Sequence, residues 1–371
     1  MQGEENMEGI KHIGVLTGGG DCPGLNAVIR AVTKTAIIRY GLEVIGFVDG
    51  FKGLVENNYI QLDLKRVSGI GHTGGTILGT SNRDNPFNYI TVNQTGSHAS
   101  DESQRAIDNM ENLGLDGLIV IGGDGTLSIT QKFHEKGVRA VGVPKTIDND
   151  LMGTDVTFGF HTAVSTASEA LDRLHTTAEA HHRVMILEVM GRYAGWIALH
   201  AGVSSSADVI LIPEIPYRIP AIVAKIAQRY RQGKKFSIIV VAEGATADGG
   251  EMVVQRLVPN SHDPVRLGGI SNQVAEEIGL RLKDIETRVT ILGHLQRGGG
   301  PIPFDRILAT RYGVAAVDAF MEGEFGQMVS LQGNRITTVP ITEAVKAIRK
   351  VDPEGDMVKA ARAIGISFGD R

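Results

Sequence analysis

The sequence holds one cysteine, one tryptophan and no apolar run of the ~18 residues that a membrane-spanning helix requires. Because one cysteine cannot form an internal disulfide and no CxxC pair occurs, a disulfide scaffold and a cysteine-rich zinc site are excluded. The first residues, MQGEENMEGIK, are polar and acidic and do not fit a signal peptide. We therefore expect a soluble cytoplasmic protein with no membrane partner.

The chain also lacks an excess of positive charge. Its 37 basic residues stand against 42 acidic ones, which gives a formal net charge of −5. Proteins that bind nucleic acids normally carry a basic excess, so we expect no nucleic-acid partner. The signature GxxxxGK[ST] of P-loop kinases does not occur, and neither do GxSxG and HExxH. An anionic ligand would have to be held by cations gathered at specific sites.

Glycine is plentiful, with 47 residues, and it punctuates an alternation of predicted strands and helices. The predicted strands are 13–16, 44–48, 118–121, 141–143, 184–189, 209–212, 238–241 and 289–292. Helices are predicted from Pro23 to Gly41, around Ile107 to Leu113, in a short segment that ends near Gly137, and over 222–230. A last set of helices is predicted to begin near Phe304. This alternation predicts an α/β fold with mostly parallel sheets covered by helices, with ligands at the carboxyl ends of the strands. Residues 84–100 and 245–269 are predicted to be surface excursions.

Two glycine-rich motifs follow predicted strands. GGGDCPG at 18–24 could hold a phosphate on its backbone N–H groups or form only a tight turn. A dinucleotide loop fits poorly, because Pro23 occupies the third glycine position of GxGxxG. In GGDGT at 122–126, glycines allow a polyphosphate to approach, and Asp124 offers an oxygen ligand to Mg²⁺. A plain Asp–Gly turn is the alternative.

Charged side chains follow other strand ends. PKTIDND at 144–150 places Asp148 and Asp150 on one side if the segment is extended, where they could accept a proton or help to hold a metal. A solvated acidic loop is the alternative, although Lys145 and Thr146 lie next to the pair. Arginines also accompany the strands of the second half: Arg183 precedes a strand, Arg192 lies in MGR, and Arg288 and Arg297 flank GHLQRGG. Their guanidinium groups are suited to phosphate recognition, although a surface ion pair is the more common role of a single arginine.

The ordered set TGGGDCPGLN, GGTILGT, GGDGT, PKTIDND, MGRYAGW and GHLQRGG resembles the 6-phosphofructokinase family over about residues 11–350. The resemblance implies two Rossmann-like α/β domains with the active site in the cleft between them. Residues 1–159 plus about 296–346 would bind the phosphoryl donor, and 160–295 plus about 347–371 the sugar phosphate. The implied reaction transfers a phosphoryl group from ATP to the 1-hydroxyl of fructose 6-phosphate, which gives fructose 1,6-bisphosphate in glycolysis. Pyrophosphate is the alternative donor.

The resemblance also assigns roles to residues. Asp148 is implied as the general base, with Thr146 and Arg192 as partners of the transferring phosphoryl and Asp124 as the Mg²⁺ ligand. The implied donor site further comprises Gly19, Arg83, Gly123, Gly125, Thr126 and Lys145. The implied sugar-phosphate site comprises Met190, Gly191, Glu243, His294 and Arg297. Arg183 and Arg288 match arginines that reach in from a neighbouring subunit, so a homo-oligomer, either a dimer or a tetramer, is implied.

Two positions favour different phosphoryl donors. Lys145 is typical of pyrophosphate users and of some ATP users, whereas Gly125 leaves space for a nucleotide. We predict ATP as the donor on that steric ground. Arg30 matches an effector-site arginine but Lys34 replaces a second one, so the resemblance does not by itself imply allosteric control by ADP or phosphoenolpyruvate.

The same motifs also argue against two other functions. If the protein were an NAD or nucleoside kinase, the motifs MGR and GHLQRGG would have no role. A non-catalytic sugar-phosphate sensor would not need both Asp124 and Asp148.

Overall fold

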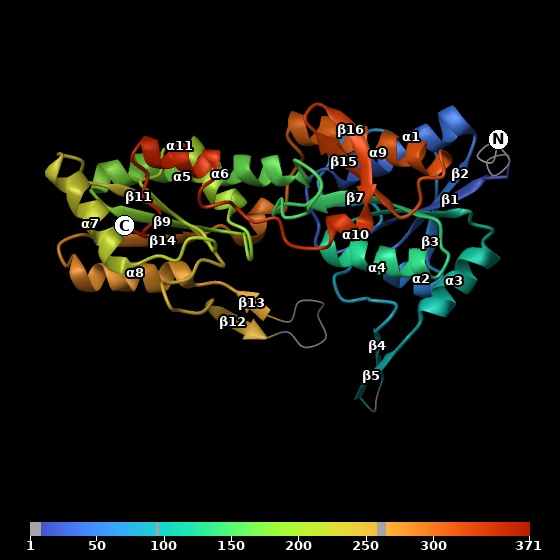
Figure 1. Ribbon diagram of the computed structural model, residues 1–371, viewed down its shortest axis with the longest axis horizontal. Helices are drawn as coiled ribbons and strands as arrows, with labels where there is room; N and C mark the ends of the chain where they lie inside the picture. The colour runs from blue at the N-terminus through green and yellow to red at the C-terminus, as the bar shows by residue number, and fades with distance from the viewer. Residues whose placement is uncertain (1–8, 94–95, 258–264) are drawn as a thin grey trace.

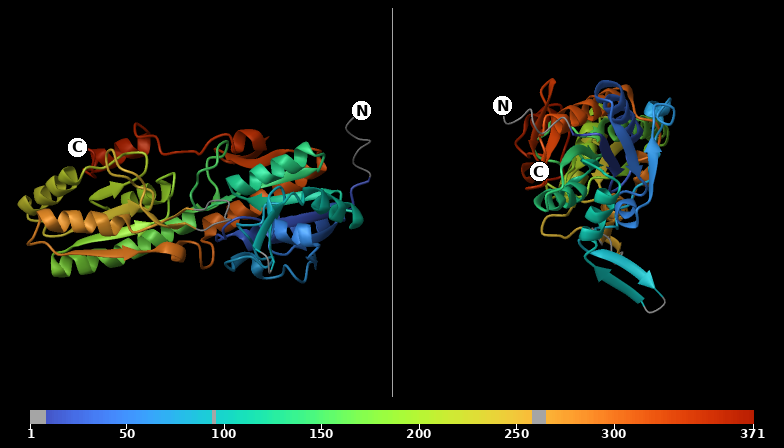
Figure 2. Two further views of the ribbon diagram at one scale, coloured as in Figure 1. Left: turned by 90° about the horizontal axis from the view of Figure 1, so that it is seen from below. Right: turned by 90° about the vertical axis from the view of Figure 1, so that its right-hand side faces the viewer.

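The computed structural model describes residues 9–93, 96–257 and 265–371, which form two lobes side by side (Figures 1 and 2). The larger lobe is built on a sheet in the order β16-β15-β7-β6-β1-β2-β3, with β8 paired to β7. Its strands are β1 (His12–Thr17), β2 (Glu43–Phe47), β3 (Tyr59–Leu62), β6 (Gly117–Gly122), β7 (Ala140–Thr146), β8 (Phe158–Gly159), β15 (Gln327–Gln332) and β16 (Arg335–Pro340). Only the edge strands β3 and β16 run antiparallel to their neighbours, so the sheet is mainly parallel.

The smaller lobe contains a four-stranded sheet in the order β10-β11-β9-β14, with every pair parallel. Its strands are β9 (Val184–Val189), β10 (Val209–Leu211), β11 (Ser237–Ala242) and β14 (Thr287–Ile291). The predicted α/β class with mainly parallel sheets is therefore confirmed. Each predicted strand is present with both ends within two residues, except that β7 ends three residues later than predicted, at Thr146. The strands β3, β8, β15 and β16 were not predicted.

Alternating side chains bury both faces of the central strands. In β6, Ile119 and Ile121 pack into one apolar cluster, while Leu118 and Val120 pack into another on the opposite face. All four side chains are at most 1% exposed. A strand that is apolar on both faces needs helices on both sides, which is the arrangement of a parallel sheet.

Helices supply those covering layers. Around the larger sheet are α1 (Leu25–Tyr40), α2 (Phe51–Glu56), α3 (Ser103–Asn112), α4 (Asp124–Glu135), α9 (Pro303–Met321), α10 (Ile341–Ala344) and the 3₁₀ turn η1 (Ile70–His72). In the smaller lobe are α5 (Phe160–His181), α6 (Trp196–Ser204), α7 (Ile219–Arg231), α8 (Ile270–Arg281), α11 (Asp356–Ala363) and the 3₁₀ turn η2 (Gly293–Gln296). No helix in the described ranges is long and apolar enough to cross a membrane.

The chain passes between the lobes three times: from β8 into α5, from η2 into α9, and from α10 into α11 (Figure 1). Each lobe is thus assembled from separated stretches of sequence. The boundaries predicted for the two domains stay a prediction.

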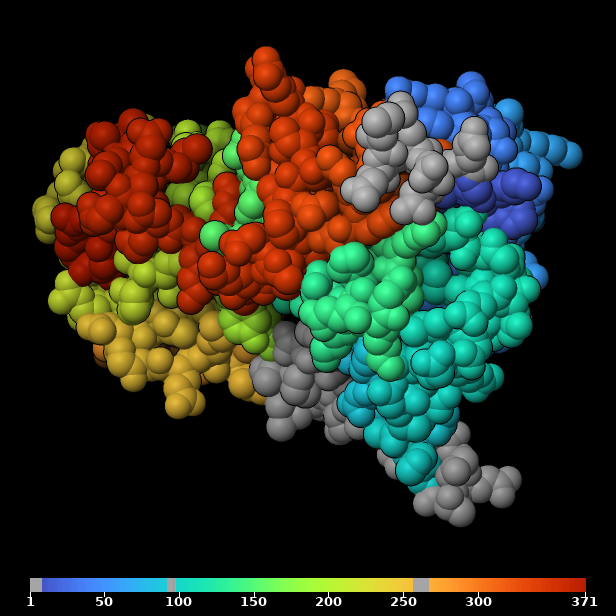
Figure 3. All heavy atoms as spheres, turned by 45° about the vertical axis from the view of Figure 1, so that its right-hand side comes forward, coloured from blue at the N-terminus to red at the C-terminus, as the bar shows by residue number. Residues whose placement is uncertain are grey.

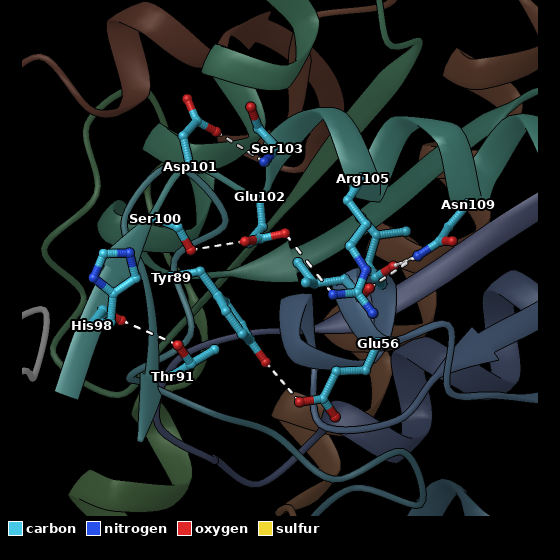
Figure 4. Close-up of polar contacts among 12 residues, drawn as sticks. Glu56, Tyr89, Thr91, His98, Ser100, Asp101, Glu102, Ser103, Arg105 and Asn109 are labelled. Carbon is cyan, nitrogen blue, oxygen red and sulfur yellow. Dashed lines mark hydrogen bonds and ion pairs between the residues drawn. The ribbon is translucent and has the colours of Figure 1, made fainter. Parts of the chain in front are cut away.

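Two hairpins project from the same side of the molecule, one from each lobe (Figure 1). They are β4 (Tyr89–Asn93) with β5 (Gly96–Ser100), and β12 (Val254–Leu257) with β13 (Val265–Leu267). The Tyr89 hydroxyl donates to Glu56 at 2.8 Å and anchors the base of the first hairpin to the larger lobe (Figure 4). The predicted surface excursions contain these hairpins, although residues 94–95 and 258–264 lie outside the described residues.

One local expectation was wrong, and the condition attached to another is not met. The first helix begins at Leu25 rather than at Pro23, because Gly24 has φ 113° and cannot belong to the helix. The segment after Thr146 is not extended, since Asn149 has φ 53° and its side-chain oxygen accepts the backbone N–H of Thr157 at 3.0 Å. The chain therefore turns between the two carboxylates of TIDND.

Candidate active site

A cleft of about 700 Å³ lies where the two lobes meet. Most of the predicted site residues line it. From the larger lobe these are Gly19, Arg83, Gly123, Asp124, Gly125, Thr126, Lys145, Thr146 and Asp148, and from the smaller lobe Met190, Arg192, Glu243, His294 and Arg297. The fold gathers them because the glycine turns and charged loops follow the carboxyl ends of β1, β6, β7, β9, β11 and β14.

The glycine turn after β1 packs against the first turn of α4. A side chain at Gly18 would come within 2.6 Å of Thr126, and Gly19 has φ +77°. Only glycine allows this close approach without strain. Helix α4 begins at Asp124 within GGDGT, so its free N–H groups and the positive end of its dipole face the cleft. This end of the cleft is suited to the phosphates of a donor.

Lys145 forms part of the wall of the same region. Its side chain is only 4% exposed, and its ammonium donates to the carbonyl oxygen of Gly20. Burial lowers the pKa of Lys145, although Asp21 and Asp124 oppose that shift. The side-chain nitrogen of Lys145 is therefore fixed against the glycine turn.

Two carboxylates of the TIDND loop face the cleft. Burial raises the pKa of Asp148, while Arg297, Lys145 and Arg192 favour its charged form. Burial also raises the pKa of Asp150, and the charge of Asp148 adds to that shift. The backbone N–H of Asp148 donates to the hydroxyl of Thr146 at 3.1 Å, which fixes the loop at the end of β7. A desolvated carboxylate among cations has the properties of a general base.

Arg297 connects the two sides of the cleft. It follows η2 in the smaller lobe, yet its guanidinium donates to the carbonyl oxygen of Asp21 at 3.2 Å in the larger one. A Cβ at Gly20 would lie 2.9 Å from this guanidinium, so the missing side chain makes room for it. On the same wall burial raises the pKa of Glu243 to about 7, with the charge of Asp148 acting in the same direction.

Three predicted residues do not line the cleft. Gly191 is buried beside it, with φ +130° and its carbonyl oxygen accepting the N–H of Gly244 at 3.1 Å, so it shapes the turn. Arg183 and Arg288 lie elsewhere on the smaller lobe, where both form ion pairs with the carboxylate of Glu286. Their implied reach into a neighbouring subunit stays a prediction.

Some residues that line the cleft had no signal in the sequence. They come mainly from α2 and from the bases of the two hairpins: Phe51, Asn85, Asn88, Ile90, Gln255 and Leu267. Turn residues and alternation could have indicated the hairpins, but no local pattern says that a hairpin lies over a cleft. Their contribution is an outcome of tertiary structure.

The cleft contains carboxylate oxygens, which are the ligands that a magnesium ion prefers. Asp124 is exposed to the cleft, and Asp148 and Asp150 are close enough for its charge to raise their pKa values. In the ranges that the structure describes, no three His, Cys, Asp or Glu side chains form a cluster that could hold a metal by themselves. Mg²⁺ commonly takes one or two carboxylates plus substrate phosphates and water, so Asp124 fits as one ligand of a site that the donor completes.

Comparison with known proteins agrees with this architecture. A family model described as Phosphofructokinase matches residues 12–320. The ATP-dependent 6-phosphofructokinase 2 of Clostridium perfringens is 56% identical, over 98% of this chain and 100% of that protein. The pyrophosphate–fructose 6-phosphate 1-phosphotransferase of Streptomyces coelicolor is 48% identical, over 96% and 99%.

A solved structure shows the same fold. The phosphofructokinase of Pichia pastoris, in its T-state, superposes with a TM-score of 0.78 at 31% identity. The match covers 98% of this chain and 37% of that longer one. With a family match over most of its length, close full-length relatives and the same two-lobed fold, the chain belongs to the phosphofructokinase family.

Proposed function

We propose that the protein transfers the terminal phosphoryl group of ATP to the 1-hydroxyl of fructose 6-phosphate. The observation that carries the proposal is Asp148, a carboxylate at the cleft between the lobes, close to Arg297, Lys145 and Arg192. Phosphoryl transfer depends on positioning and on neutralising charge, with little covalent chemistry for the protein to perform. This arrangement supplies both, together with a proton acceptor.

In the proposed reaction the sugar hydroxyl oxygen bonds to the γ-phosphorus while the bond between that phosphorus and the bridging oxygen of ADP breaks. The hydroxyl proton passes to the carboxylate of Asp148, and ADP leaves with the bridging oxygen. Arg192 and Thr146 line the cleft beside Asp148 and would bind the oxygens of the transferring group. The raised pKa of Asp148 makes it a stronger base than an ordinary aspartate.

The larger lobe would hold the donor. Its glycine turn and the start of α4 would bind the donor phosphates together with Arg83, which also lines the cleft. Asp124 would hold Mg²⁺, which when bound neutralises charge on the donor phosphates. Lys145, which is buried in the wall of the same region, would also contact the donor phosphates.

The smaller lobe would hold the sugar phosphate. Met190, Glu243, His294 and Arg297 line its side of the cleft and provide apolar contact, acceptors and cations. We further propose a homo-oligomer, because Arg183 and Arg288 do not line this chain's own cleft and would serve a neighbour's site. A cytoplasmic location is part of the same proposal.

ATP is proposed as the donor because Gly125, in the first turn of α4, places no side chain in the cleft. An aspartate there would fill space next to the terminal phosphates and repel an α-phosphate. Pyrophosphate is the second candidate, and the buried cation of Lys145 favours it.

A coupled assay with fructose 6-phosphate, run separately with Mg-ATP and Mg-pyrophosphate, tests the proposal. We expect fructose 1,6-bisphosphate with ATP and a much lower rate with pyrophosphate. Activity with pyrophosphate alone would contradict the donor but keep the acceptor. Absence of product with both donors, from enzyme that binds neither ligand by calorimetry, would contradict the proposed function.

A further inference from the structure

The segment between α10 and α11, residues 345–355, crosses from the larger lobe to the smaller one, and we name it the strap (Figures 1 and 3). Helix α10 packs on α4 in the larger lobe, whereas α11 packs on α6 in the smaller lobe. The strap therefore has a fixed point on each lobe. Arg349 lies between these points and contacts both lobes.

On the larger lobe Arg349 binds the loop that follows β7. Its backbone N–H donates to the carbonyl oxygen of Asp150 at 2.8 Å. Its guanidinium donates to the carbonyl oxygens of Thr154 at 3.1 Å and Asp155 at 2.7 Å. One residue thus holds both ends of the stretch 150–155, immediately after Asp148.

On the smaller lobe the same residue binds Trp196, the first residue of α6. The indole N–H of Trp196 donates to the carbonyl oxygen of Arg349 at 2.9 Å, and the guanidinium carbon lies 4.9 Å from the centre of the indole ring. Such a stacked cation is attracted by the face of the ring. Both the backbone and the side chain of Arg349 therefore contact each lobe.

Glu214 reinforces the connection to the smaller lobe. Its carboxylate accepts the backbone N–H of Gly195 at 3.0 Å and the backbone N–H of Val351 at 2.8 Å. The loop that carries Arg192 ends at Gly195 and Trp196, so this loop is joined to the strap twice. The same few residues of the strap hold the loop of Asp148 on the other lobe.

We propose that Arg349 is a positioning residue that sets the placement of the Asp148 loop relative to the Arg192 loop across the cleft. It touches neither reacting group, and the inference rests on the proposed function, in which Asp148 and Arg192 act on the same hydroxyl and phosphoryl. Displacing a reacting group by about 1 Å can cost about 100-fold in rate. A planar guanidinium that bridges two carbonyls and stacks on an indole resists such displacement better than a single ammonium does.

Arg349→Met and Arg349→Lys test the proposal, with Lys346→Met as the matched control. Lys346 lies on the same strap and forms an exposed ion pair with Glu343 at 3.6 Å, so its replacement removes a charge without touching the loops. We expect Arg349→Met to lower kcat by about 10- to 100-fold while each KM changes by less than about threefold. Arg349→Lys should recover part of the loss, and the control should match the wild type.

Hydrogen–deuterium exchange of the ligand-free protein gives a readout that does not need activity. Residues 147–157 and 191–196 should both exchange faster in Arg349→Met and remain unchanged in Lys346→Met. If Arg349→Met does not fold, Trp196→Phe removes the indole N–H donor and leaves a smaller aromatic ring under the guanidinium, and it should move kcat and exchange in the same direction by less.

Unchanged kcat in the folded variants, a rise in KM alone, or faster exchange spread evenly over the whole chain would overturn the proposal. If the wild type has no phosphoryl-transfer activity, the proposed function fails while the exchange result still decides whether Arg349 holds both loops. Faster exchange in only one loop would contradict its role as a link.

Discussion

The ammonium of Lys145 donates a hydrogen bond to the carbonyl oxygen of Gly20, which ties the end of β7 to the glycine turn after β1. With 4% of the residue exposed, this lysine is part of the wall of the cleft and is not a flexible side chain in solvent. The choice between donors therefore depends on how the fixed amino group of Lys145 and the absence of a side chain at Gly125 act together.

Gly125→Asp tests the steric half of that choice. The new carboxylate should lower kcat/KM for ATP by at least about 100-fold, because it occupies space in the cleft and repels the α-phosphate. Use of pyrophosphate should change far less. Gly125→Ala provides the control, since it adds one methyl group without charge. Equal loss with both donors would contradict the steric account.

Asp148→Asn should lower kcat by about 10²- to 10⁴-fold, which is the usual contribution of a general base. The amide keeps the shape of the carboxylate but accepts no proton, so fructose 6-phosphate should still bind when measured by calorimetry. A variant with nearly normal kcat would remove Asp148 from this role.

Glu243→Gln should change how stability depends on pH. Burial raises the pKa of Glu243 to about 7 in the folded protein, so between its ordinary pKa near 4.5 and pH 7 the folded state holds more protons than the unfolded state. The contribution of Glu243 to the free energy of unfolding of the wild type therefore falls as pH rises through that window.

The measurement is urea unfolding of the ligand-free protein at pH 4.5 and pH 8. Glu243→Gln should match the wild type at pH 4.5 and be more stable at pH 8, because the glutamine carries no charge to desolvate. Glu251→Gln, at an exposed position, should show no such gain. An equal change at both pH values would argue against titration of Glu243.

Complementation between variants tests the proposed oligomer. Asp148→Asn and Arg183→Ala each damage a different part of the site, and a mixed oligomer would contain some sites with neither change if Arg183 acts on a neighbour. Mixing the two inactive proteins under conditions that exchange subunits should restore activity. Proven exchange without recovery would indicate that Arg183 serves only its own chain, where it pairs with Glu286.

The sequence predicted most of the parallel strands, the fold class and most of the residues at the cleft for one shared reason. Glycine turns and charged residues follow apolar runs, and parallel strands bring those ends to one edge of a sheet. Thr126, Lys145 and Asp148 could be placed in this way because their neighbours in sequence define their positions. The turn at Asn149 could not, since its left-handed backbone depends on a hydrogen bond to Thr157.

Tertiary structure alone decides the environments of individual side chains and the contacts between segments that are distant in sequence. Burial of Lys145 and the raised pKa of Glu243 depend on what surrounds each side chain after the lobes have packed. Arg349 meets Asp150 on one lobe and Trp196 on the other, at a separation of 153 residues from the tryptophan. Local sequence indicates most strands and helices, but such a contact exists only when the two lobes meet, so no nearby residue pattern could reveal it.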